Sequence, residues 1–153
     1  MRAEQAIKVH CEAGISMYMS LAHAVLGMLH FFSGDLASAQ RCVEQGLALA
    51  QSSGERAYEG MASFVLGAVL GAADPSQSRR AEEYLLKGIA IEEELGARPF
   101  SCMGHFFLGQ HYANGGRRDK ALEHFTTARA MSEEMEMGFW LMLAQSSLDG
   151  LSK

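Results

Sequence analysis

The sequence is poor in residues that break helices and in residues that build covalent or metal frameworks. It has only two prolines in 153 residues, and its three cysteines, Cys11, Cys42 and Cys102, are widely spaced with no CxxC pair. A low proline content favours helices, and isolated cysteines argue against a disulfide framework or a zinc ribbon. We therefore expect free thiols in a reducing compartment, with the cytoplasm as the default location, and no metal or other cofactor.

Long apolar runs and an excess of basic charge are also missing. No stretch approaches the ~20 apolar residues that cross a bilayer, and the first ten residues lack the apolar core of a signal peptide. The formal net charge of −5 argues against a nucleic-acid partner, which would require a basic face. With 48% hydrophobic and 20% charged residues, the composition is that of one globular domain with no membrane partner.

What the sequence does contain is an internal repeat of 40 to 42 residues. The pair Leu-Gly recurs at residues 26–27, 66–67 and 108–109, and an alanine recurs at residues 39, 81 and 121. Each alanine is followed seven positions later by a small residue, at 46, 88 and 128. Glycines at 14, 54 and 96 precede each Leu-Gly glycine by 13 residues. We call these recurring residues the markers of the repeat. Since they all recur with the same period, they indicate a repeat architecture.

Each repeat predicts two helices. The first runs from just after residue 14, 54 or 96 to about residue 33, 71 or 114. The second starts near residue 35, 78 or 119 and ends at the next glycine, a residue typical of helix C-termini. In the second helices, small and apolar residues step by four and three, which predicts one buried face. The middle repeat carries two extra residues within GAADPSQS, where Asp74-Pro75 predicts a turn.

These markers resemble the tetratricopeptide repeat (TPR). The third repeat matches that pattern best, through Leu108, Gly109, Tyr112, Gly116, Ala121, Phe125 and Ala128. A period above the usual length of about 34 residues implies longer helices, as in the variety found in bacterial signalling proteins. The resemblance implies an all-α fold, a right-handed α-solenoid of antiparallel helix pairs with about eight helices.

The repeat frame predicts a single domain over residues 1–153. It would contain a half repeat at 1–14, full repeats at 15–54, 55–96 and 97–137, and a capping helix at 138–153, because a solenoid needs capped ends. The N-terminal half repeat indicates a cut edge and the capping helix a natural end. The last repeats, which close with EEMEMGFWL, also resemble the C-terminal repeats of bacterial proteins that join a nucleotide cyclase domain to an ATPase module.

Residues 104–125 raise the question of a ligand site, because they contain three histidines and the basic segment GGRRDK. The histidine pairs 23/30 and 105/111 are spaced by seven and six residues, whereas a helical zinc site needs i, i+4. The basic segment lacks the Walker pattern, and Gly116 occupies the turn between the two helices of the repeat. The acidic runs 92–94 and 133–134 indicate solvated faces. We expect no metal site, no catalytic residue and no enzymatic activity.

The family resemblance implies a binding face along the first helix of each repeat. Carried over residue by residue, its positions are Leu21, Ala24, Met28, Phe31, Phe32, Met61, Phe64, Ala68, Met103, Phe106, Gln110 and Asn114. We expect roughly half of these side chains to pack between repeats and the others to form an apolar groove. The Lys and Asn that clamp a peptide carboxylate in chaperone-binding family members are absent from these positions, so clamp function is not expected.

The expected function is therefore that of a non-catalytic protein–protein interaction scaffold, as the C-terminal repeat region of a larger bacterial signalling or regulatory protein. Its groove would bind an apolar or amphipathic segment of a partner protein or of another domain of the same protein. Changing Phe64 and Phe106 to aspartate is expected to abolish partner binding and to leave helicity intact. Two alternatives stay open: a small-ligand sensor domain of an ATP-dependent regulator, and a module that self-associates into a homo-oligomer.

Overall fold

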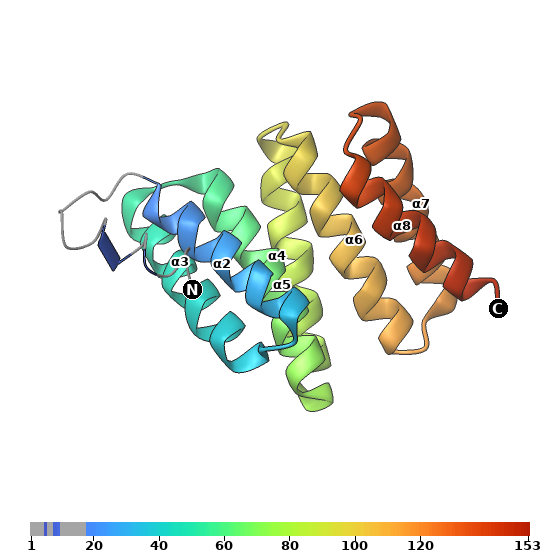
Figure 1. Cartoon of the computed structure of the whole chain (residues 1–153), viewed down its shortest axis with the longest axis horizontal. Coiled ribbons are helices and arrows are strands. Elements are labelled where there is room, and N and C mark those ends of the chain that lie inside the picture. The colour runs from blue at the N-terminus through green and yellow to red at the C-terminus, as the bar shows by residue number, and fades with distance from the viewer. Residues whose placement is uncertain (1–4, 6–7, 10–17) are drawn as a thin grey trace.

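The computed structural model describes residues 5, 8, 9 and 18–153, and this part of the chain is all-α (Figure 1). Its α-helices are α2 (Met19–Ser33), α3 (Leu36–Ser53), α4 (Arg56–Ala73), α5 (Ser78–Glu94), α6 (Arg98–Asn114), α7 (Arg118–Glu134) and α8 (Gly138–Leu151). A short 3₁₀ helix, η1 (Pro75–Gln77), precedes α5. The helix predicted within residues 1–14 lies largely outside the described residues.

The seven α-helices of the described part confirm the helix pairs that the repeat predicted. The bounds of α3 to α6 and the start of α7 lie within about two residues of the predicted positions, which is the usual uncertainty of helix boundaries. The end of α7 differs: the sequence predicts a helix that continues to Gly138, but α7 ends at Glu134, and Glu136 adopts the left-handed conformation in place of a glycine. The described part of the first pair begins later than predicted, because α2 starts at Met19 and Tyr18 before it has a left-handed φ of 63°. The predicted final helix is α8.

Left-handed glycines separate most of the helices. Gly34 and Gly116 lie between the two helices of a repeat, and Gly54 and Gly96 lie between repeats, with φ values from 65° to 85°. Residues with a Cβ pay roughly 1–2 kcal/mol in this region, which explains the regular spacing of the glycines. Glu136 adopts the same conformation before α8, with φ 55°.

The middle repeat accommodates its two extra residues in a capped turn, as predicted. The Asp74 carboxylate accepts a hydrogen bond from the Ser76 amide at 2.9 Å, and Pro75 begins η1 directly after it. This pattern is that of an Asx-capped turn. The insertion therefore lies between α4 and α5 and leaves both helices uninterrupted.

The glycine of each Leu-Gly pair lies against the second helix of its own repeat. A Cβ added to any of these glycines would collide with the side chain at one repeat position of that helix. The contacting pairs are Gly27–Val43, Gly67–Leu85 and Gly109–Phe125. Since Val43, Leu85 and Phe125 each lie four residues after a marker alanine, the three repeats share one packing register.

The helices pack mainly against their neighbours in sequence (Figure 1). The even-numbered helices also contact one another in the order α2, α4, α6, α8, whereas in the described residues α3, α5 and α7 make no contact with one another. The row of even-numbered helices is therefore the more crowded side of the molecule. This arrangement is consistent with a helical repeat.

None of the described helices combines the length and the apolar character that a membrane span requires.

Candidate functional site

The side formed by α2, α4, α6 and α8, which we call the even-helix face, carries a connected set of aromatic rings. Neighbouring rings have centroids between 5.6 and 6.2 Å apart. We call this set the aromatic cluster; it comprises Phe31, Phe32, Phe64, Phe106, Phe107, Phe125, Phe139 and Trp140. Seven of the eight rings belong to even-numbered helices, and Phe125 belongs to α7.

Phe107 of α6 lies at the centre of the aromatic cluster and is completely buried. The centroid of its ring is 5.6 Å from that of Phe31, 6.0 Å from that of Phe64 and 5.8 Å from that of Trp140. Pairs at such separations contribute roughly 0.5–1.5 kcal/mol beyond their apolar burial. Phe107 therefore connects α6 with the other three even-numbered helices.

The first and last helices of the described chain meet through this cluster. The Phe32 ring of α2 lies 6.2 Å from the rings of both Phe139 and Trp140 on α8, although the backbones of α2 and α8 are not in contact. The protein's own side chains thus fill much of the space in which the sequence predicted an open groove.

The twelve predicted groove residues divide by burial. Half of them belong to the packed interior, with at most 8% of the residue exposed: Ala24, Met61, Phe64, Ala68, Met103 and Phe106. Four are half-buried, namely Leu21, Met28, Phe31 and Gln110, and two are exposed, Phe32 and Asn114. An aspartate at position 64 or 106 would bury a charge in the core, so these substitutions would disrupt folding and do not probe partner binding as the sequence suggested.

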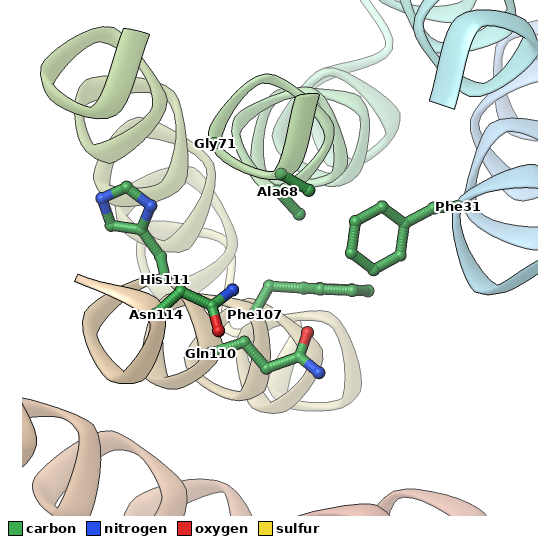
Figure 2. A pocket seen from close by; sticks show the side chains of 8 residues that line it. Phe31, Ala68, Gly71, Phe107, Gln110, His111 and Asn114 are labelled. Carbon is green, nitrogen blue, oxygen red and sulfur yellow. The ribbon is translucent and has the colours of Figure 1, made fainter. Parts of the chain in front are cut away.

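A small pocket remains beside the aromatic cluster (Figure 2). Its volume is about 20 Å³, enough for about one water molecule. Figure 2 shows the carboxamides of Gln110 and Asn114 on α6, with the Phe31 ring extending from α2 toward Phe107. His111 lines the same pocket, and burial lowers its pKa. Four predicted groove residues are brought together here: Phe31, Ala68, Gln110 and Asn114.

Beside this pocket the even-helix face leaves three large apolar side chains in solvent, which we call the apolar patch. Phe32, Phe139 and Met142 are 41%, 55% and 59% exposed. Phe139 and Met142 are three residues apart on α8 and therefore lie on the same side of it, and Phe139 contacts Phe32. Connected apolar exposure of this kind is typical of surfaces that contact other molecules.

Sequence reasoning missed Phe107, Phe139, Trp140 and Met142 as members of this face. Phe106 and Phe107 are adjacent in the sequence, and both are buried because α4, α5, α7 and α8 all contact α6. The segment FWLM at residues 139–142 was assigned to a capping helix, and its apolar content was the available signal.

The histidines form a pair that their sequence spacing did not indicate. His105 meets His124 of α7, with 2.9 Å between the two Nδ1 atoms, and its Nε2 lies 3.3 Å from a carboxylate oxygen of Glu93. One Nδ1 must donate and the other accept, and burial together with the nearby His105 lowers the pKa of His124. Among the described residues, no group of three His, Cys, Asp or Glu side chains is arranged to hold a metal ion.

The basic segment GGRRDK forms the predicted turn between α6 and α7. Gly116 has a φ of 72°. Arg117 donates a hydrogen bond to Glu82 at 2.7 Å and lies 4.3 Å above the Tyr112 ring. Tyr112 donates to the same carboxylate at 2.8 Å, and burial together with Glu82 raises the pKa of its hydroxyl to about 12. The Arg117 side chain is therefore held by Glu82 and Tyr112 of the protein itself.

Comparison with known proteins gives no family for this chain. No protein-family model matches it, and no curated protein matches it.

Proposed function

We propose that this protein is a non-catalytic interaction scaffold of the TPR type. In this proposal the helix pairs form a right-handed α-solenoid, and the even-helix face binds an apolar or amphipathic segment of a partner protein or of another domain in a longer signalling protein. The observation that carries the proposal is the apolar patch of Phe32, Phe139 and Met142, exposed on the face where the even-numbered helices converge.

The repeat supports the scaffold part of the proposal. Three helix pairs share one period in the sequence and one glycine register in packing, as expected for quasi-one-dimensional repeat proteins. The contacts along the even-numbered helices, without matching contacts among the odd-numbered ones, favour a stack that curves toward the even-helix face.

The chemistry of the face supports the choice of ligand. The exposed rings and the Met142 thioether supply apolar area, worth roughly 25 cal/mol per Å² when covered, and methionine adapts its shape to varied partners. The carboxamides of Gln110 and Asn114 lie at the neighbouring pocket and can donate to and accept from a backbone. An amphipathic helix with apolar residues on one side matches this combination.

The experiment is a peptide selection followed by affinity measurements. Peptides of random sequence are selected on the immobilised protein, and their affinities are measured by fluorescence anisotropy for the native protein and for Phe139→Asp and Met142→Asp. We expect the selected peptides to carry apolar residues at helical spacing and to bind each variant at least tenfold more weakly, since both side chains are exposed and their replacement leaves the core intact.

Leu122→Asp is the matched control, because Leu122 is 49% exposed but belongs to the odd-numbered helix α7. It should bind the selected peptides as the native protein does. Equal affinity of the native protein and both even-face variants would refute the proposal.

Self-association through the same apolar patch is a second candidate function, favoured by the exposure of Phe139 and Met142. Light scattering across a wide concentration range separates the two. A native dimer that Phe139→Asp converts to a monomer would favour self-association, and a monomer at every concentration would remove it.

A further inference from the structure

The opposite side of the molecule, formed by α3, α5 and α7 and called here the odd-helix side, contains two aligned junctions. In the first, α3 and α5 flank α4, and an ion network occupies the space. Lys87 of α5 lies 3.1 Å from one oxygen of Glu59 on α4, and Arg56 lies 3.0 Å from the other. Burial alone would raise the pKa of Glu59, but the hydrogen bonds from Lys87 and Arg56 outweigh it and lower that pKa.

The second junction, where α5 and α7 flank α6, lacks this network. The repeat frame aligns Ser101 with Glu59 and Thr127 with Lys87, so a carboxylate and a long ammonium side chain are replaced by two short hydroxyl side chains. The space they leave is a cavity of about 260 Å³, room for several water molecules at roughly 30 Å³ each. It is lined by Glu92, Glu93, Arg98, Ser101, His105, Thr127 and Met131, together with Gly96.

The acidic residues of this cavity lie at other repeat positions than Glu59, and no lysine stands at the position aligned with Lys87. Glu93 stands where the first junction has Gln51, and it accepts from His105 Nε2 at 3.3 Å. The Arg98 guanidinium donates both of its terminal nitrogens to Glu134, at 3.0 and 2.5 Å, and is therefore engaged outside the cavity. Glu92 in the cavity wall is fully buried, and neither of its carboxyl oxygens has a hydrogen-bond partner.

We propose that the cavity between α5, α6 and α7 binds a small ligand with a primary ammonium group. The ammonium takes the place that the Lys87 head group occupies in the aligned junction and pairs with Glu93. The hydroxyls of Ser101 and Thr127 accept its remaining hydrogen bonds, and the Met131 side chain covers the alkyl part. This site is separate from the even-helix face, so its outcome is independent of the partner-binding proposal.

The first test titrates 1,4-diaminobutane into the ¹⁵N-labelled chain of residues 1–153 and follows amide shifts by NMR. We expect saturable shifts at Ser101, Thr127 and Met131, no saturable shift with the neutral isostere 1,4-butanediol, and at least fivefold weaker binding to Glu93→Gln. Shifts that are equal for the diamine and the diol, or unchanged by Glu93→Gln, would overturn the proposal.

A tethered cation gives the second test. Thr127→Lys copies Lys87 into the cavity and is expected to abolish diamine binding and to raise the melting temperature by a few degrees. Thr126→Lys is the matched control, since it adds the same charge at the adjacent exposed position outside the cavity lining; it should leave binding within twofold of the native value. If the two lysine substitutions changed diamine binding equally, only the overall charge would matter, and the proposed site would be refuted.

Discussion

The even-helix face and the odd-helix side of this molecule are held together by different interactions. On the even-helix face, aromatic rings from all four helices touch, and Phe107 is buried among them. On the odd-helix side the helices stand apart, and polar networks or a cavity occupy the gaps. Apolar packing tolerates little change in volume, whereas exposed polar contacts can be exchanged at small cost. We therefore expect substitutions in the aromatic cluster to change stability more than substitutions in the polar contacts of the odd-helix side.

Removal of the central ring should have the largest effect on stability. We expect Phe107→Ala to lower the free energy of unfolding by about 4 kcal/mol, since a fully buried ring leaves both a cavity and several unpaired aromatic neighbours. Urea denaturation followed by circular dichroism measures this change. The control is Phe139→Ala in the same cluster, where the ring is 55% exposed and the expected loss is about 1 kcal/mol or less. Equal losses would mean that Phe107 is not the centre of the face.

Replacement of Glu92 should give the second largest change in stability, and this change should be an increase. Burial raises the pKa of its carboxyl to about 8, from an ordinary value of 4.5. Between these values the native state holds a proton that the unfolded state releases, so the free energy of unfolding falls as the pH rises from 4.5 toward 8 and then levels off. Glu92→Gln removes this loss, so we expect the variant to be more stable than the native protein at pH 8 and similar to it near pH 4.5. A gain that does not grow with pH would contradict this account.

A double substitution at Gly60 and Glu92 tests whether these two residues compensate for each other in size. Glu92 fills the space beside Gly60, where an added Cβ would collide with the carboxyl group. The aligned pair in the first repeat is Ser20 with Ala50. We expect Gly60→Ser to destabilise the native protein and to be much less destabilising in the Glu92→Ala background, where the Ile91 methyl group, 2.9 Å from the added Cβ, is the close neighbour that remains. A double-mutant cycle measures this coupling. Additive effects would show that the two positions do not share space.

Disturbing the close contact between the two helices of a repeat should lower the stability by a smaller but measurable amount. A Cβ on Gly67 would lie 2.6 Å from the Ala81 carbonyl oxygen, so Gly67→Ala should cost about 2 kcal/mol in spite of alanine's better helix propensity. Gly150→Ala on α8 is the control, because nothing lies within 4 Å of its added Cβ; it should stabilise by about 0.5 kcal/mol. Thermal unfolding compares the two variants, and equal melting temperatures would exclude the shared glycine register.

Removal of a single surface ion pair should have the smallest effect on stability. Arg117 and Glu82 retain 39% and 23% side-chain exposure, so solvent screens their attraction. We expect Arg117→Ala to lose about 1 kcal/mol at low salt and less at 1 M NaCl, where charges are screened within about 3 Å. A loss that is as large at high salt as at low salt would indicate that the stacking on Tyr112 dominates.

The fold was predictable because its determinants are local and repeated. The marker residues placed all three helix pairs, the turn at Asp74-Pro75 and the final helix, since left-handed glycines and small helix-contact residues recur at fixed positions. The candidate site was predictable only in part. Periodicity shows which helices form the face, but it does not show that Phe32 of α2 reaches Phe139 and Trp140 of α8, because that contact depends on how the helices between them pack.

The charged positions were the least predictable. The sequence predicts that the three glutamates at residues 92–94 form a solvated acidic face. In the structure Glu92 is fully buried, whereas Glu93 and Glu94 are exposed. Its burial depends on Gly60, a residue 32 positions earlier in the chain, and no local pattern records that pairing. The His105–His124 contact depends in the same way on two adjacent helices.

The central claim is that the first and last described helices close over the same face through the aromatic cluster. Trp140 is the only tryptophan of the chain, so its fluorescence reports this contact directly. We predict that Phe32→Ala, a substitution on the distant helix α2, shifts the emission of Trp140 to longer wavelength by exposing its ring, while the far-ultraviolet circular dichroism stays unchanged. An unchanged emission spectrum in that variant would show that α2 and α8 do not meet and would contradict the claim.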